Sequence, residues 1–274
     1  MAGGFTLGDK TAADLNLILL KDTESNILPN TRDLTVEIYG KPGAYDFGGE
    51  MAPRTFELQC ALVRKQTLAD FQSSIRTIAS HLMDSNGHPK TLKLIFDSEP
   101  DKYYNVRYSG SLPIRHISTT GFFTLPLTAY DPFAYNINQK SIGKSVSNGA
   151  TVQLTNSGTA ATPFVIELGV QSEDGYTYFP AVSLGIYPDI STTSSYNPRF
   201  VLGGKQLSYT GYVSGGDLLS IDTGNFTATK NGNSVIGNIS GEWFLLEPGE
   251  LTLYFYDSGG GTSFITVTYR ERWL

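Results

Sequence analysis

One triplet in the sequence has the residue types of a protease, Asp222-Thr223-Gly224, and it follows an apolar run. Aspartic proteases need two such carboxylates, because the two groups share one proton. The chain holds a single copy, and Asn225 stands where serine or threonine usually follows. The triplet therefore predicts a turn at the end of a strand, leading into Phe226, and not a catalytic site.

A second candidate is the acidic alternation of Asp97, Glu99 and Asp101, which is typical of a calcium-binding loop. Lys102 occupies the position where such a loop needs glycine, and no glutamate follows at the required distance. Pro100 and the neighbouring tyrosines favour a turn between two strands. We therefore expect no metal site here.

Histidine and cysteine chemistry is sparse. His81, His88 and His116 form no pair with the spacing of a zinc hydrolase, and none belongs to a nucleophile motif shared with Cys60. His81 is expected at the end of a helix, where positive charge is favourable without any catalytic role. A single cysteine excludes a disulfide framework and a cysteine-built metal site.

Glu242, Glu247 and Glu250 lie close together in the sequence and could supply the two carboxylates of a glycosidase. Their setting, an apolar run followed by Pro248-Gly249, favours a strand and a tight turn instead. No phosphate loop or cofactor motif is present. The sequence predicts a protein that is not an enzyme and has no cofactor.

Aromatic side chains are the remaining chemical signal. The chain has 16 tyrosines, and Tyr176, Tyr178 and Tyr187 fall in its second half. Such residues can stack on sugar rings or pack strands together. Packing and subunit contacts are favoured, and saccharide contact at these three tyrosines is the alternative.

The composition limits the classes of molecule that the protein is expected to bind. The net charge is −6 and no run of lysine or arginine occurs, which makes sequence-specific nucleic-acid binding an unfavoured function. No secretion leader and no membrane-spanning apolar stretch are expected. We expect a soluble protein, made in the cytoplasm and not bound to membranes.

One helix is predicted, from Thr67 to Asp84. Apolar residues recur at steps of three and four, and Thr67 with Asp70 can cap the first turn. Before the helix, Asp33–Tyr39 and Phe56–Leu62 alternate as strands, with a turn at Gly40–Gly43. After it, Leu92–Tyr135 is expected to form a meander that completes the first domain.

A change of composition marks the domain boundary. Residues 1–135 carry 28 charged side chains, whereas residues 136–274 carry 18 and read as short strands separated by turn residues. Asn231-Gly232 is a strong hairpin signal. We predict a mainly β protein: a β-sandwich-like domain with one α-helix over residues 1–135, then a jelly-roll β-sandwich over residues 136–274.

Several segments together resemble the distal tail proteins of bacteriophages with long, non-contractile tails. In the first half these are Tyr45–Glu50, Pro53-Arg54, Phe56–Leu62, the single helix, Phe96–Tyr104 and Asp131–Tyr135. In the second half they are Leu218–Thr223, Asn231-Gly232, Leu246–Gly249 and Val267–Leu274, which resemble the galectin-like domain of that family.

The resemblance implies a structural virion protein at the tail tip, assembled in the host cytoplasm. Members of the family form hexameric rings, single or stacked, which join the tail tube protein to the tail-tip protein, and in some cases a receptor-binding protein. The ring leaves a channel for DNA. A saccharide-binding protein acting through the second half is the alternative function.

A closed ring needs two different contact faces on each subunit. We expect one face at Tyr45 and Phe47, which lie between glycines, and the other on the outer side of the helix at Gln72 and Arg76.

Overall fold

The computed structural model describes residues 4–20, 28–117, 119–170, 194–259 and 262–274. The chain divides into two compact units, one formed by Met1–Ile137 together with Leu274 and the other by Asn138–Trp273. The expected mainly β fold is confirmed, with one α-helix among the described residues.

Unit 1 is built on one antiparallel sheet, whose strands run in the order β2-β1-β7-β8-β10-β6-β3, with β9 paired to β10 and β11 paired to β8. A separate hairpin, β4–β5, precedes β6. The elements are β1 Phe5–Leu7, β2 Lys10–Thr11, β3 Leu17–Leu19, β4 Thr31–Glu37, β5 Ala44–Met51, β6 Arg54–Leu62, α1 Leu68–Leu82, β7 Thr91–Phe96, β8 Lys102–Tyr108, β9 Arg115–Ile117, β10 Thr120–Ala129 and β11 Ala134–Asn136.

A short connection forces this sheet to curl. β2 and β3 lie at opposite ends of a path of seven strands, yet Thr11 is separated from Leu17 by a single tight turn. A flat path would place these ends about 29 Å apart at ~4.8 Å per strand. The connecting residues span at most about 20 Å. The Asp14 carboxylate fixes the turn by accepting hydrogen bonds from the Thr11 amide and hydroxyl, at 2.9 and 2.7 Å.

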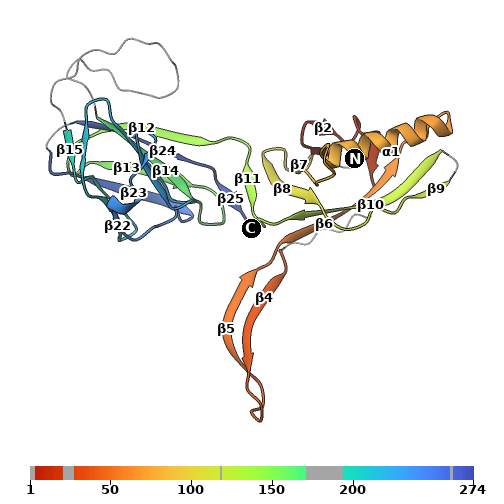
Figure 1. Ribbon diagram of the computed structural model, residues 1–274, viewed down its shortest axis with the longest axis horizontal. Coiled ribbons are helices and arrows are strands. Elements are labelled where there is room, and N and C mark those ends of the chain that lie inside the picture. Colours follow the sequence, from red (N-terminus) through yellow and green to blue (C-terminus); the bar gives the residue numbers. More distant parts are fainter. Residues whose placement is uncertain (1–3, 21–27, 118, 171–193, 260–261) are drawn as a thin grey trace. The chain divides into compact units, whose positions relative to one another are not determined.

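Helix α1 covers the inner face of the curled sheet (Figure 1). Thr67 caps it as predicted: its hydroxyl oxygen accepts from the Asp70 amide at 3.1 Å. Phe71, Ile78 and Leu82 are buried against the sheet, and Leu68 is exposed. The helix ends at Leu82 with Met83 as its C-cap, so Gly87 belongs to the following turn and not to the helix cap.

Unit 2 is a β-sandwich with a shared apolar core. One sheet has the order β12-β24-β14-β19-β20-β21 and the other β13-β23-β16-β17-β22, with β15 and β18 paired separately. The elements are β12 Lys140–Val146, β13 Thr151–Asn156, β14 Phe164–Val170, β15 Ser194–Tyr196, β16 Arg199–Leu202, β17 Lys205–Tyr209, β18 Tyr212–Ser214, β19 Leu218–Asp222, β20 Thr227–Lys230, β21 Asn233–Ser234, the 3-10 turn Ile236–Asn238, β22 Ile239–Gly241, β23 Gly249–Tyr256, β24 Ser263–Tyr269 and β25 Arg272–Trp273.

The Asn231-Gly232 signal is confirmed as a hairpin turn between β20 and β21. Both residues have positive φ, 51° and 78°. A two-residue hairpin turn whose twist matches that of its strands requires positive φ at both positions.

The buried carboxylate of Glu271 links the C-terminal segment of unit 2 to two segments near its start. Glu271, which is 3% exposed, accepts hydrogen bonds from Lys140 Nζ at 2.6 Å and from the Ser157 amide at 2.5 Å. Burial by itself raises the pKa of Glu271, but the hydrogen bonds from Lys140 and Ser157 outweigh it and leave the pKa below its ordinary value. The ionised form is therefore the one that stabilises the fold.

We expect Glu271→Gln to lower the free energy of unfolding by about 1–3 kcal/mol at pH 7, because buried donors lose a charged acceptor. Since the folded pKa is depressed, the stabilisation is complete above the unfolded pKa of about 4.3 and disappears as the pH falls through the lower, folded pKa. Urea unfolding at pH 7 and at low pH measures the difference, with Glu247→Gln, an exposed site, as the control. Equal losses in both variants at pH 7 would contradict this role.

Candidate assembly interface

The hairpin β4–β5 is exposed along its whole length. Every residue from Asn30 to Met51 is exposed, although both strands carry large apolar side chains. Figure 1 shows the hairpin leaving the sheet of unit 1. An isolated two-stranded hairpin is at best marginally stable in water. The hairpin therefore presents apolar surface that its own unit does not cover.

Three of the large apolar side chains share one face of the hairpin. Val36 lies directly opposite Tyr45, and Phe47 follows two residues later on the same strand. Their exposed fractions are 50, 46 and 68%. The other face is polar, since Thr35 lies opposite Asp46. We call Val36, Tyr45 and Phe47 the apolar hairpin face; it contains both of the residues predicted from the sequence.

The base of the hairpin is tied to the sheet. The Ala52 amide donates to the Asn30 carbonyl at 2.7 Å and closes the two arms. Arg54 follows at once as the first residue of β6; it is buried and donates to the Tyr104 hydroxyl at 3.0 Å. The hairpin is thus a direct continuation of a core strand.

The other predicted contact residues, Gln72 and Arg76, are exposed on the outer side of α1. That side of the helix is polar apart from Leu68 in the first turn, which is 59% exposed. It can supply hydrogen bonds and charge to a neighbour but little apolar surface.

A second apolar surface lies on the outer face of the sheet, and the sequence analysis missed it. Ile18 of β3 and Phe122 of β10 both lie opposite Ala61 of β6, so the three side chains form one row. Ile18 and Phe122 are 49 and 40% exposed. We call this row the sheet patch. The alternation of β10, which buries Phe123 and Leu125, was the signal that could have placed Phe122 outside.

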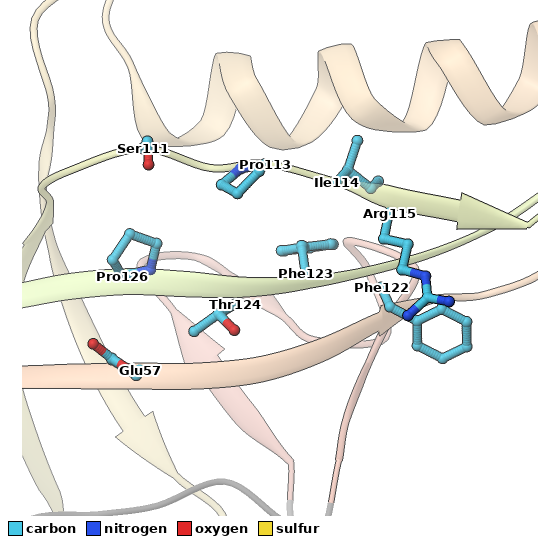
Figure 2. Close-up of a pocket in the computed structure, with 9 residues that line it drawn as sticks. All are labelled: Glu57, Ser111, Pro113, Ile114, Arg115, Phe122, Phe123, Thr124 and Pro126. Carbon is cyan, nitrogen blue, oxygen red and sulfur yellow. The ribbon is translucent and has the colours of Figure 1, made fainter.

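A groove of about 630 Å³ leads to the sheet patch. Figure 2 shows Ser111, Pro113 and Arg115 on one side of it and Thr124 of β10 on the other, with Phe122 beside Arg115 at one end. The segment that carries Ile114 packs close to β10 because residue 121 is glycine: a Cβ there would stand 2.6 Å from Ile114 Cδ1. The groove is open to solvent.

The acidic turn connects β7 and β8, as predicted. Asp97 accepts from the Gly4 amide at 2.9 Å, and Glu99 pairs with Lys102 at 3.0 Å. Across the described residues, no group of three or more His, Cys, Asp or Glu side chains is placed to hold a metal ion. None of the described helices is long and apolar enough to cross a membrane.

Each described histidine side chain has a structural setting. His81 is buried, and its Nε2 donates to the Leu7 carbonyl at 2.7 Å, which joins α1 to β1. His88 is exposed, with Nδ1 at 3.5 Å from the Asp84 carboxylate. His116 lies in β9, with its backbone opposite Gly121.

The protease-like triplet forms a turn. Asp222 accepts from the amides of Gly224 and Asn225, at 2.8 and 3.1 Å. Thr223 is fully buried and exchanges hydrogen bonds with the backbone of Phe164. These bonds close one end of the sandwich.

The remaining candidate residues of unit 2 are the three glutamates considered for glycosidase chemistry and the three tyrosines considered for saccharide contact. Glu242, Glu247 and Glu250 are all exposed; the first two lie between β22 and β23, and Glu250 lies in β23. Tyr176, Tyr178 and Tyr187 lie outside the described residues, so saccharide contact there stays a prediction. Elsewhere in the unit, Phe226 is 59% exposed and lies edge-on to Trp243, with ring centroids 5.6 Å apart.

Two family models match the chain. Residues 10–129 match the phage tail protein RIFT-related domain, and residues 186–273 match the C-terminal domain of siphovirus-type tail components. Together with the fold, these matches define a bacteriophage tail protein. The chain belongs to the distal tail proteins of phages with long, non-contractile tails. It is a structural component of the phage tail and not an enzyme.

A solved structure shares the fold, and two others show weaker similarity. The SPP1 Dit (gp 19.1) protein, described as a paradigm of hub adsorption apparatus in phages that infect Gram-positive hosts, is similar over 100% of both chains, with a TM-score of 0.73 and 15% identity. Two structures of the phage P2 baseplate in its activated conformation, with Ca and with Sr, cover 98% of each chain at TM-scores of 0.42 and 0.41 and 7% identity. No curated protein sequence matches the chain.

Cys60 belongs to the apolar core of unit 1 and is fully buried on the inner side of β6. Burial raises the pKa of its thiol to about 12. We therefore expect no reaction of the folded protein with maleimide at pH 7, because the thiolate is the reactive form. Mass spectrometry should show one added label after denaturation. Rapid labelling of the folded protein would contradict the packing of β6.

Proposed function

We propose that this protein forms a hexameric ring at the distal end of the phage tail, where it joins the tail tube protein to the tail-tip protein and leaves a channel for DNA. The ring is assembled from soluble subunits in the host cytoplasm and becomes part of the virion tail. A receptor-binding protein is a further candidate partner.

The observation that carries the proposal is the exposed apolar hairpin face. Monomeric proteins rarely leave large apolar side chains clustered in water, and such clusters usually mark contacts with other proteins. A second copy of the same chain is the simplest partner, and most soluble oligomers are symmetric assemblies of one chain.

The geometry of unit 1 is compatible with a ring. The hairpin is a projecting element that can pack on a different surface of its neighbour. When this contact is head-to-tail and not reciprocal, it closes into a ring if the rotation between neighbours divides the circle. Gln72 and Arg76 remain in the proposal as polar residues at the edge of this contact.

The hairpin can be tested directly by charge. Light scattering of the parent protein should give the mass of six 29.8 kDa subunits, about 180 kDa in all. The double substitution Tyr45→Asp and Phe47→Asp should shift the mass toward a single subunit, because burying two new carboxylates without partners is strongly unfavourable. Electron microscopy of the parent should show rings with an open centre.

Thr35→Asp is the matched control, because Thr35 lies on the opposite, polar face of the same hairpin. It should leave the ring intact. Rings that survive the Tyr45 and Phe47 changes would remove the hairpin from the contact, and a monomeric parent would overturn the ring itself. The pair Gln72→Glu and Arg76→Glu tests the helix in the same assay.

A further inference from the structure

We infer that the sheet patch, Ile18, Ala61 and Phe122, is the surface on which the apolar hairpin face of the neighbouring copy packs. The inference rests on the proposed ring and names its second contact face. It moves the apolar part of that face from the outer side of α1, where the sequence placed it, to the outer side of the sheet.

Surface chemistry favours the sheet patch over the helix. The apolar hairpin face consists of a valine and two aromatic residues, and it needs an apolar partner. Ile18 and Phe122 offer exposed aliphatic and aromatic surface on either side of the small residue Ala61. The outer side of α1 offers Gln72 and Arg76 instead.

Charge points to the same pairing. The segment from Asn30 to Pro53 carries four acidic and two basic side chains, a net charge of −2. Arg115 lies opposite Phe122, and Arg64 and Lys65 follow the end of β6, whereas one acidic residue, Glu57, lines the adjoining groove. Complementary charge of this kind directs association and fixes the orientation of the contact.

The placement of the two surfaces allows a head-to-tail contact. The hairpin joins β6 at Arg54, and the sheet patch lies near its other end, where Ala61 precedes Leu62. These ends are about 26 Å apart at ~3.3 Å per residue. Each copy thus presents the hairpin from one end of β6 and the sheet patch at the other, as a repeating chain of contacts requires.

The groove beside β10 extends the same surface. It opens at Phe122 and Arg115, which also border the sheet patch. Ile114, in the segment that forms its outer wall, lies so close over Gly121 that a Cβ at position 121 would stand 2.6 Å from Ile114 Cδ1. A hairpin lying across the sheet patch can place an aromatic side chain in this groove.

Cysteine cross-linking tests the pairing, because the native Cys60 is fully buried and leaves no background. In the variant Phe47→Cys with Phe122→Cys, mild oxidation should link successive copies. A non-reducing gel should then show a ladder in steps of one subunit, up to six. Each single variant can link two copies at most. The pair Phe47→Cys with Ile18→Cys probes the same contact at a second position.

Thr35→Cys with Phe122→Cys is the matched control, from the polar face of the hairpin, and it should cross-link several-fold more slowly. Rings seen by light scattering under reducing conditions, with no ladder from either test pair, would overturn the inference while leaving the ring standing. A link formed within one chain would also overturn it. A parent protein that forms no ring removes both the proposed function and this inference.

Discussion

In the proposed ring, the apolar hairpin face is the constraint on which the rest of the assembly depends. Fully burying a side chain such as valine or phenylalanine is worth about 1.5–3 kcal/mol, so covering the exposed half of Val36, Tyr45 and Phe47 contributes on the order of 3 kcal/mol. Association of two proteins costs about 4–15 kcal/mol. One hairpin is therefore too little to hold two copies together, and additional surface or ring closure must supply the difference.

Unit 1 provides a rigid support for that hairpin. The tight turn between β2 and β3 curls the sheet, and the helix and the buried row of β6 fill its inner side. Because β6 is buried on one face and its burial alternates from Arg54 to Cys60, its outward residues have a fixed register. The hairpin at one end of β6 and Ala61 at the other are therefore held at a constant separation in every copy.

The sequence predicted those features that local patterns determine. Thr67 and Asp70 identified the helix start, Asn231-Gly232 identified a hairpin, and alternation identified the strand that became β4. Alternation shows which residues share a face, but it cannot show what covers that face, so the exposure of Val36 was not predictable. The curl depends on β2 and β3, which are too short to show periodicity. Ile18 was missed for that reason, and Phe122 because Phe123 adjoins it.

The continuity of β5 and β6 also has a mechanical meaning. β6 is paired with β10 over nine consecutive residue pairs, from Arg54 with Ala129 to Leu62 with Gly121. A pull on the hairpin along the axis of β6 loads the hydrogen bonds of this ladder in shear, so they share the force instead of breaking one after another. In a ring of such subunits, tension passes from each copy into the best-paired strand of its sheet, and the contact surface and the tether are one continuous piece of chain.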